Sequence, residues 1–437
     1  MPSTAITDVR METFVIEGGY ALNGSVRAAG NKNAALPILA ACVLTEELVQ
    51  LSNVPHIGDV ETMVALLADL GVDIGWTGPN ELRVHAADLE KTDLDEELCG
   101  RIRASFLLAG PLLSRAGRAL VPPPGGDVIG RRRLDPHIHA LSELGAQVGF
   151  DRRYEMSAPG GLRGARIFLD EASVMATENT VMAAVLAAGE TRLGNAASEP
   201  HVQDLCNFLN ALGARIDNIG SNTLHIHGVE GLSGGDFTIG ADYLEVVSYI
   251  GAALVTGGSV RVRAAGPEHL NMARLVFRRL GAEWEVDGQD IVVPADQKLE
   301  VEPDLGGAIP SISVMPWPAF PTDLMSVAIV VASQSKGTVL FHDWMFEGRM
   351  FFIDKLVSMG ARIILCDPHR CIVEGPRQLV GETLESPDIR AGLALVLAAL
   401  AGRGSSTIRN ISQIDRGYER IEEKLRALGA AIERIDI

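Results

Sequence analysis

The feature that most constrains the fold of this chain is a sequence pattern that occurs six times along its 437 residues. In each copy, apolar residues of helical period end in Leu or Met, a Gly follows, and strand-like alternation comes next. In the first copy Met63, Leu66, Leu67 and Leu70 lie on one face of a helix. Gly71 comes after them, where a helix end favours a left-handed residue. The corresponding glycines of the other copies are Gly145, Gly213, Gly281, Gly360 and Gly429.

A second pattern alternates with the first and consists of an Ala-rich apolar helix that ends near a Gly and precedes a strand. Helices that are apolar nearly all round belong inside a domain. A unit of about 70 residues is too small to bury both of its helices alone, so several units must pack together with the Ala-rich helices inside. The repeats leave open one solenoid, two sets of three units, or a scaffold without chemistry. Examples of the second pattern are residues 36–54, 180–197, 246–265 and 393–411.

Composition narrows the classes of function. Hydrophobic residues make up 47% and charged residues 22% of the chain, proportions typical of globular proteins. The net charge of -18 argues against nucleic acid as a partner, because that needs a broad basic face. A small anion can still bind to a local basic cluster in an acidic protein.

The cysteines and the apolar runs predict a cytoplasmic protein without a metal or a bound cofactor. The five cysteines are odd in number and follow neither a disulfide nor a zinc spacing. No Gly-x-Gly-x-x-Gly follows a predicted strand in the context that dinucleotide binding requires. The longest apolar runs, near residues 392–401, are too short to span a membrane, so we expect no membrane partner. A reducing compartment fits these observations.

Charged residues interrupt the repeats in six segments where a scaffold has no need of them. Each segment alone can be a solvated loop or a helix cap, as for Asp323 before an apolar helix. If the segments converge, they form a strong dianion site, since Arg binds phosphate and carboxylate in a forked manner. The basic residues concerned are Lys32, Arg103, Arg132, Arg349, Arg390 and Arg416.

These segments, in order, carry a resemblance to a known family over nearly the whole chain. The motifs GNKNAALPILAA, RIRASFLLAGPLL, PPGGDVIGRRRLDPHI, EASVMATENT, PAFPTDL, FEGRM, PDIRAGLALVLAAL and IDRGYERIEEKLRALGA resemble the UDP-N-acetylglucosamine enolpyruvyl transferases of peptidoglycan synthesis. Related enzymes that act on shikimate 3-phosphate carry a Lys-Ser-x-Ser-Asn-Arg pattern near the N-terminus. Here Lys32 is followed by Asn33 and Ala34, so that phosphate site is missing.

The resemblance implies the grouping of the repeats. It implies a two-domain inside-out α/β barrel built from six repeats of about 70 residues, three per domain, as in EPSP synthase, with substrates in a cleft between the domains. The discontinuous first domain comprises residues 1–31 plus 241–437 and holds the catalytic arginines. The second domain comprises residues 32–240 and holds a catalytic loop around residues 122–133.

The resemblance also implies roles for individual residues. Lys32 and Arg416 match residues that hold the phosphate or carboxylate of phosphoenolpyruvate, and Arg132 matches a loop arginine on the phosphate. Arg349 and Arg390 match carboxylate contacts. Further substrate contacts, mostly to the UDP-sugar, are implied for Asn33, Arg103, Asp135, Ser173, Val174 and Met345.

Two carboxylates receive catalytic roles by the same resemblance. Asp323 matches the proton acceptor near the sugar 3-hydroxyl, and Asp388 pairs with that site. Asp127 stands where most members carry a cysteine, and it is implied as the acid that protonates the methylene carbon of phosphoenolpyruvate. Fosfomycin inactivates the usual enzymes by alkylating that cysteine. A carboxylate is a weaker nucleophile than a thiolate, so we expect no such inactivation here.

Four departures from the family pattern bear on the acceptor: Arg133 replaces a common Pro, Met175 a common Gly, Tyr243 a common Arg, and Gly348 a common Asn. Three functions therefore remain to be compared. They are the peptidoglycan enzyme, with its consequences for cell shape and division, an enolpyruvyl transferase that acts on another nucleotide or sugar, and a non-catalytic UDP-sugar binding paralogue. The oligomeric state cannot be derived from the sequence.

Overall fold

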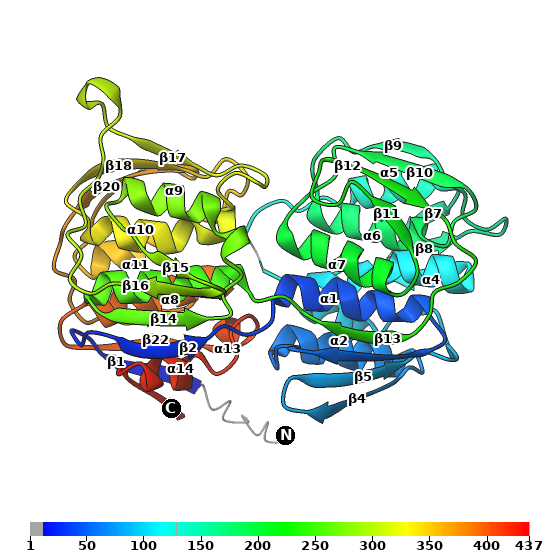
Figure 1. Cartoon of the computed structure of the whole chain (residues 1–437), viewed down its shortest axis with the longest axis horizontal. Coiled ribbons are helices and arrows are strands. Elements are labelled where there is room, and N and C mark those ends of the chain that lie inside the picture. The colour runs from blue at the N-terminus through cyan, green and yellow to red at the C-terminus, as the bar shows by residue number, and fades with distance from the viewer. Residues whose placement is uncertain (1–11, 128, 437) are drawn as a thin grey trace, which may run out of the picture. The chain divides into compact units, whose positions relative to one another are not determined.

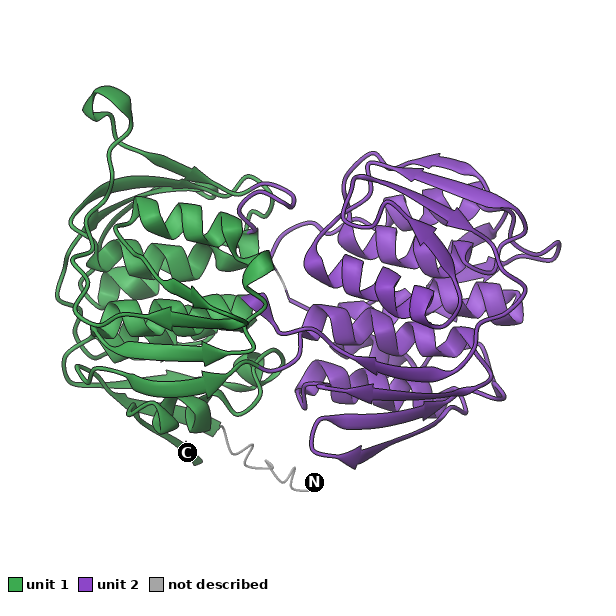
Figure 2. Ribbon diagram, in the orientation of Figure 1, with its two compact units in different colours: residues 1–28, 244–314, 322–437 green, residues 29–243, 315–321 purple. Residues whose placement is uncertain are grey.

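The computed structural model describes residues 12–127 and 129–436. Their contacts divide the chain into two compact units, coloured separately in Figure 2. Unit 1 contains the described residues up to Ala28 together with Leu244–Val314 and the chain from Thr322 onward. Unit 2 contains Ala29–Tyr243 and Met315–Pro321. Within unit 2, the two connecting segments pair through an isolated antiparallel bridge between Gly30 and Ala241.

The described residues of unit 2 form three sheets; the first two each contain one parallel strand pair, and the third is antiparallel throughout. The first has the order β13-β3-β5-β4, the second β11-β12-β10-β9, and the third β6-β8-β7. The strands are β3 (Leu48–Ser52), β4 (Asp73–Gly78), β5 (Glu81–His85), β6 (Arg118–Val121), β7 (Gln147–Asp151), β8 (Arg153–Ser157), β9 (Arg166–Phe168), β10 (Glu190–Gly194), β11 (Arg215–Asp217), β12 (Thr223–His227) and β13 (Gly235–Thr238).

The described part of unit 1 also forms three sheets, each of four strands, with the orders β21-β22-β1-β23, β15-β16-β14-β2 and β17-β18-β20-β19. The strands are β1 (Glu12–Glu17), β2 (Asn23–Arg27), β14 (Ser259–Arg263), β15 (Glu285–Asp287), β16 (Asp290–Val293), β17 (Ser311–Ser313), β18 (Gly337–His342), β19 (Arg362–Asp367), β20 (Arg370–Gly375), β21 (Thr383–Glu385), β22 (Ser405–Arg409) and β23 (Ala431–Asp436).

Central helices fill each unit behind its sheets (Figure 1). The helices that begin at Lys32, Met325 and Ile389 are buried almost throughout because apolar residues lie on nearly every side, as the second pattern predicts. The helix that begins at Val174 is also buried, although it includes Glu178 and Asn179. The central helices are α1 (Lys32–Ala41), α4 (Ala109–Ala116) and α6 (Val174–Ala184) in unit 2, and α8 (Tyr243–Thr256), α10 (Met325–Gln334) and α12 (Ile389–Ala401) in unit 1.

Glycines let the central helices approach closely. A Cβ added to Gly251 of α8 would lie 2.7 Å from a side-chain carbon of Val327 on α10 and 3.2 Å from one of Leu397 on α12. In unit 2, a Cβ on Gly110 of α4 would lie 2.6 Å from the backbone oxygen of Asn179 on α6. Real Cβ atoms do not approach so closely, so a larger residue at either position would push the helices apart.

The first sequence pattern forms the more peripheral helices, each followed by a strand. The expected helix ends are confirmed, because Gly71, Gly145, Gly213, Gly281, Gly360 and Gly429 all have φ between 83° and 101°. These helices are α2 (Gly58–Asp69), α5 (Asp135–Glu143), α7 (Pro200–Ala211), α9 (Asn271–Arg279), α11 (Ile353–Ser358) and α14 (Ile421–Ala427); two further short helices are α3 (Glu96–Arg101) and α13 (Ser412–Asp415).

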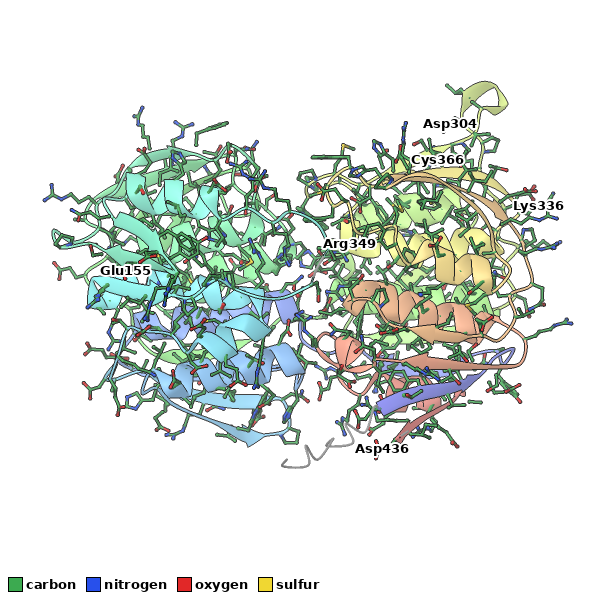
Figure 3. All side chains as sticks on the ribbon, turned by 180° about the vertical axis from the view of Figure 1, so that it is seen from behind. Glu155, Asp304, Lys336, Arg349, Cys366 and Asp436 are labelled. Atoms are coloured by element: carbon green, nitrogen blue, oxygen red, sulfur yellow. The ribbon has the colours of Figure 1, made fainter. Side chains whose placement is uncertain are left out.

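All five cysteines are free thiols, and Cys366 on β19 is exposed (Figure 3) whereas the other four are buried. In residues 12–127 and 129–436, no helix combines the length and the apolar character that crossing a bilayer requires.

Candidate active site

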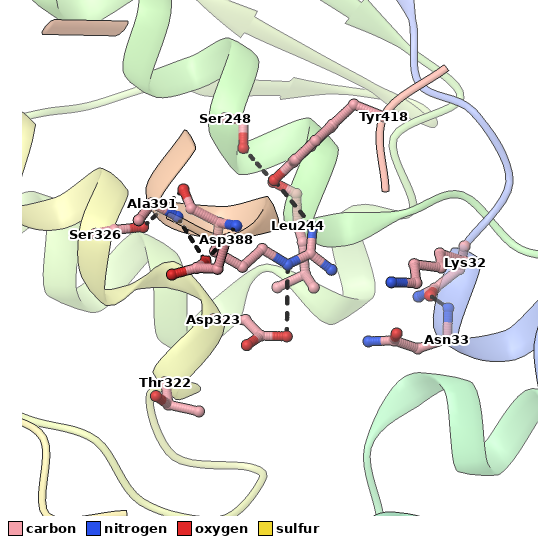
Figure 4. Close-up of polar contacts among 12 residues, drawn as sticks. Lys32, Asn33, Leu244, Ser248, Thr322, Asp323, Ser326, Asp388, Ala391 and Tyr418 are labelled. Atoms are coloured by element: carbon pink, nitrogen blue, oxygen red, sulfur yellow. Dashed lines mark hydrogen bonds and ion pairs between the residues drawn. The ribbon is translucent and has the colours of Figure 1, made fainter. Parts of the chain in front are cut away.

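Two acidic and two basic side chains of unit 1 lie together where α10 and α12 begin. Asp323 belongs to the 3₁₀ helix η5 (Thr322–Leu324), directly before α10. The Nη2 atom of Arg349 donates to Oδ1 of Asp323, and Nη1 of Arg349 lies 3.7 Å from Oδ1 of Asp388. Nε of Arg390 lies 3.6 Å from Oδ2 of Asp323. The sequence-predicted residues Asp323, Arg349, Asp388 and Arg390 are therefore brought together, as Figure 4 shows for the two labelled carboxylates.

The start of α12 fixes the positions of Asp388 and Arg390. Asp388 is the N-cap residue, and its Oδ1 accepts from the backbone N–H groups of Arg390 and Ala391 at 2.8 and 3.0 Å. Nη1 of Arg390 donates to the hydroxyl oxygen of Tyr418 at 2.9 Å, and its guanidinium carbon lies 5.3 Å from that ring's centroid. Since only 6% of the Arg390 side chain is exposed, these partners hold a buried positive charge.

Asp323 is not the N-cap residue of α10, the role that the sequence left open for it. The N-cap of α10 is Leu324, which makes no side-chain capping hydrogen bond. The Asp323 carboxylate instead takes part in the ion pairs with Arg349 and Arg390. Asp388, by contrast, both caps a helix and takes part in the cluster.

A small pocket opens beside this cluster within unit 1. Its lining comes from η5, α10, α12 and the segment around Arg349. The Nε atom of Arg349 is buried, and no residue that the structure describes accepts a hydrogen bond from it. The lining residues are Thr322, Met325, Ser326, Arg349, Asp388 and Ala391.

Arg416 lies at the C-terminal end of α13, and a network of ion pairs holds its segment. Nη1 of Arg416 donates to Oε1 of Gln413 at 3.0 Å. The preceding residue, Asp415, accepts from both Nη atoms of Arg434 on β23, at 2.9 and 2.7 Å. Arg434 also donates to Glu422 on α14, so one guanidinium ties two helices to the last strand.

In unit 2, Lys32 occupies the first position of α1, as the sequence predicts. Asn31 is the N-cap, and its Oδ1 accepts from the backbone N–H of Asn33 at 2.8 Å. The Nζ atom of Lys32 lies 2.7 Å from Oδ2 of Asp59 on α2, and the two side chains are 9% and 7% exposed. This buried ion pair holds a positive charge at the N-terminus of a helix, where an anion is favoured.

The loop between β6 and α5 carries Asp127 and Arg132. It is anchored at its start, because Gly125 N donates to the carbonyl oxygen of Cys99 at 3.0 Å. Nη2 of Arg103 donates to the carbonyl oxygens of Arg132 and Arg133 at 2.7 and 3.1 Å, which anchors the other end. Burial, and secondarily the charge of Arg132, lowers the pKa of Arg103 to about 10. Asp127, half-buried, lies between these two anchors.

Arg133, one of the departures from the family pattern, joins the end of this loop to the segment before α6. It lies 3.3 Å from Asp135, the first residue of α5, and 3.0 Å from Asp170. The pKa of Asp135 is lowered mainly because its carboxylate accepts a hydrogen bond from the backbone N–H of Asp135 itself. The charge of Arg133 makes a smaller contribution in the same direction. Ser173, three residues after Asp170, caps α6 and accepts from Ala176 N at 3.4 Å. Val174 follows as the first residue of α6.

A comparison with protein-family models identifies the family. The model described as EPSP synthase (3-phosphoshikimate 1-carboxyvinyltransferase) matches residues 16–425. The chain belongs to the EPSP synthase family. Together with the relatives and the solved structures below, this match confirms the family resemblance inferred from the motifs and the implied fold class.

Curated relatives within this family are similar over nearly their whole length. A protein of Bradyrhizobium diazoefficiens is 56% identical over 422 residues, which cover 97% of this chain and 98% of the relative. A protein of Treponema denticola is 51% identical, and the match covers 97% of this chain and 99% of the relative. A protein of Bacteroides fragilis is 46% identical, and the match covers 97% of this chain and 100% of the relative. All three are named UDP-N-acetylglucosamine 1-carboxyvinyltransferase.

Solved structures of EPSP synthase-like proteins have the same fold. The enolpyruvyl transferase NikO from Streptomyces tendae superimposes with a TM-score of 0.85 at 24% identity, covering 98% of this chain and 100% of that chain. EPSP synthase from Acinetobacter baumannii gives a TM-score of 0.75 at 18% identity, covering 97% and 100%.

Two buried carboxylates beside the candidate residues could not be singled out from the sequence. Asp59 lies inside α2 and looks like an ordinary first-turn acid, and only its contact with Lys32 reveals it. Asp343 follows β18, and its Oδ1 accepts from the backbone N–H groups of Met345 and Phe346. The sequence signal that could have identified Asp343 is its position directly after a predicted strand and three residues before the FEGRM motif. Across the described residues, no group of three or more His, Cys, Asp or Glu side chains is placed to hold a metal ion.

Proposed function

We propose that this protein transfers the enolpyruvyl group of phosphoenolpyruvate to the 3-hydroxyl of UDP-N-acetylglucosamine and releases phosphate. The supporting observation is the 56% identity, over 97% of the chain, to a relative named for that carboxyvinyl transfer. The cluster of Asp323, Arg349, Asp388 and Arg390 supplies the charges that such a reaction requires.

Unit 1 supplies the contacts to the donor carboxylate and the base. The charges of two arginines and two aspartates in its cluster cancel, so a substrate carboxylate must compete with Asp323 and Asp388 for the guanidinium groups. Arg349 and Arg390 bind the carboxylate of phosphoenolpyruvate in forked geometry. As Arg349 turns to the substrate, Asp323 is released to accept the proton of the sugar hydroxyl.

Lys32 and Arg132 of unit 2 and Arg416 of unit 1 bind the donor phosphate. Lys32 combines its charge with the N-terminus of α1. Asn33, Arg103, Asp135, Ser173, Val174 and Met345 contact the substrates, mostly the UDP-sugar. The proposal thus assigns residues of both compact units to one reaction, and it keeps 1–31 plus 241–437 and 32–240 as the proposed limits of the two domains.

The reaction proceeds by addition and elimination. The sugar oxygen bonds to C2 of phosphoenolpyruvate and loses its proton to Asp323, while Asp127 donates a proton to C3. A tetrahedral phospho-ketal with a C3 methyl group results. The Asp127 carboxylate, which has given its proton to C3, takes a proton back from that methyl group; the electron pair of the C–H bond restores the double bond, and phosphate leaves with the electron pair of its bond to C2. The product is the enolpyruvyl ether.

The biological setting follows as part of the proposal. The product is the first committed intermediate of peptidoglycan synthesis, which links the enzyme to cell-wall formation, cell shape and division. Five free thiols favour a reducing cytoplasm as its location.

A phosphate-release assay with an acceptor panel tests the function. With phosphoenolpyruvate present, we expect release with UDP-N-acetylglucosamine, and none above background with UMP or shikimate 3-phosphate. Faster release with UMP would instead identify an enolpyruvyl transferase of another nucleotide. Tight UDP-sugar binding without release for any acceptor would identify a non-catalytic paralogue.

A further inference from the structure

Asp343 is fully buried at the end of β18, and the proposed reaction assigns it no role. Its Oδ1 accepts from the backbone N–H groups of Met345 and Phe346, at 3.0 and 3.3 Å. Its Oδ2 accepts a hydrogen bond from the hydroxyl group of Thr322. One carboxylate therefore joins two segments that are 21 residues apart in the sequence.

The backbone of Asp343 is fixed from a third direction. Its N–H donates to the carbonyl oxygen of His369 at 2.8 Å, and its carbonyl oxygen lies 2.7 Å from Nδ1 of His369. The backbone N–H of His369 donates to Oδ1 of Asp367 at 2.8 Å, which shapes the turn between β19 and β20. Asp343 is thus held by the sheet and in turn holds two loops.

The two loops carry the main ion pair of the site. Thr322 directly precedes Asp323, the proposed base. Met345 and Phe346 begin the segment that leads to Arg349, the proposed carboxylate ligand, whose guanidinium carbon lies 5.7 Å from the centroid of the Phe346 ring. A displacement of either loop would change the geometry between Asp323 and Arg349.

The charge of Asp343 has more than a turn-capping use. Burial raises the pKa of the Asp343 carboxyl, whereas the Thr322 hydroxyl, the charge of Arg349 and the two amides act in the opposite direction. A Ser or Asn would cap the same two amides without burying a charge. A carboxylate at position 343 does two things that a neutral cap does not. It accepts a hydrogen bond from the Thr322 hydroxyl with its second oxygen, and it interacts with the charge of Arg349.

We propose that Asp343 is a positioning residue for the enolpyruvyl transfer, which sets the geometry of Asp323 against Arg349 through Thr322 and the turn at Met345 and Phe346. The inference rests on the proposed function and adds a buried element to it. Asp343 touches neither substrate in this account and acts through its neighbours alone.

The test uses substitutions of Thr322 and Asp343 in the full-length protein. Thr322→Val removes the hydroxyl donor at nearly constant volume, and Thr322→Ser keeps it. We expect Thr322→Val and Asp343→Asn each to lower kcat/KM for phosphoenolpyruvate about 10-fold or more, since small misplacements of reacting groups cost that much. Thr322→Ser should stay within about 2-fold of wild type on the same grounds. The KM for UDP-N-acetylglucosamine should change less than the KM for phosphoenolpyruvate.

A matched control separates positioning from general stability. Thr256→Val, also in unit 1, removes a hydroxyl that donates to the carbonyl oxygen of Ala252 on α8 and should leave both KM values unchanged. Where Asp343→Asn fails to fold, Thr322→Val decides alone. The proposal is overturned if Thr322→Val keeps the wild-type kcat/KM, or loses it only in proportion to a lowered unfolding temperature. A wild-type protein without phosphate release would instead overturn the proposed function itself.

Discussion

Asp323 and Arg349 form an ion pair in which the side chains are 25% and 10% exposed, and Arg349 is also the residue proposed to bind the substrate carboxylate. The base is thus held by the arginine that the substrate needs. Binding of phosphoenolpyruvate and release of the base become one event, because a carboxylate that takes Arg349 leaves Asp323 more able to accept a proton.

The first prediction concerns Asp323→Asn. We expect turnover to fall by about 100-fold or more, the usual effect of losing a general base. The KM for phosphoenolpyruvate should not rise, because the substrate no longer has to compete with the Asp323 carboxylate for Arg349. Phosphate release over a range of donor concentrations measures both values. Asp354→Asn, at an exposed acid on α11, is the control and should retain full turnover.

The second prediction concerns the loop acid. Asp127→Asn keeps the size of the side chain and removes the transferable proton, so turnover should fall by about 100-fold. The wild-type protein should form no covalent adduct with fosfomycin, because a carboxylate is a weak nucleophile.

The chemistry of position 127 gives the matching control. Asp127→Cys should acquire a fosfomycin adduct, visible as an added mass on the peptide of residues 122–133. A wild-type adduct on that peptide, or full turnover in Asp127→Asn, would contradict the role of Asp127.

The third prediction concerns the buried pair of Lys32 and Asp59. Lys32→Met removes the ammonium group 2.7 Å from the Asp59 carboxylate and should lower the free energy of unfolding by about 3 kcal/mol. Combining it with Asp59→Asn should restore part of that stability, because the buried negative charge is then also gone. Chemical denaturation measures the stabilities.

The same variants separate stability from catalysis. Lys32→Met should lose turnover, since Lys32 is proposed to bind the donor phosphate. The double variant should stay inactive even where its stability is partly restored. Wild-type turnover in the stabilised double variant would show that Lys32 serves only the fold.

The fourth prediction concerns His137, which is buried against Phe106 and accepts from Asn179 at its Nδ1, 3.1 Å away. Burial, with a smaller effect of the Arg103 charge, lowers the pKa of His137 to about 3, below its ordinary 6.5. Between these values the unfolded chain binds a proton that the folded protein does not. The free energy of unfolding therefore rises with pH across this window, by up to about 1.4 kcal/mol per pH unit from this group.

Denaturant titrations at several pH values from about 4 to 7 test this linkage, because that range includes the ordinary histidine pKa of about 6.5. His137→Gln should lose this part of the pH dependence. His139→Gln, at an exposed position on the same helix, should keep it. Equal slopes for all three proteins would show that His137 does not remain neutral in the folded state.

Local rules predicted much of the fold. The six helix-ending glycines and the buried Ala-rich helices depend only on sequence neighbours, so the pattern was readable. The central helix α4 was harder to recognise, because the 3₁₀ helix η2 (Arg103–Leu108) precedes it and Pro111 lies inside it. Those interruptions break the helical period over which a pattern is counted.

Site contacts were less predictable because they join distant segments. The placement of Lys32 at a helix start followed from local sequence and is confirmed, whereas its partner Asp59 lies on another helix. Asp323 was compatible with a cap by sequence, and only the ion pair with Arg349 distinguishes the two roles. Asp343 resembles any polar residue after a strand until Thr322 is seen beside it.

The most direct measurement of the central claim is identification of the reaction product by NMR. Isotopically labelled phosphoenolpyruvate and UDP-N-acetylglucosamine are incubated with the protein, and phosphate is measured in the same sample. We predict a labelled enolpyruvyl group bonded through C2 to the 3-oxygen of the sugar, with one phosphate released per ether formed. Label that stays in phosphoenolpyruvate while the UDP-sugar is recovered unchanged would contradict the account.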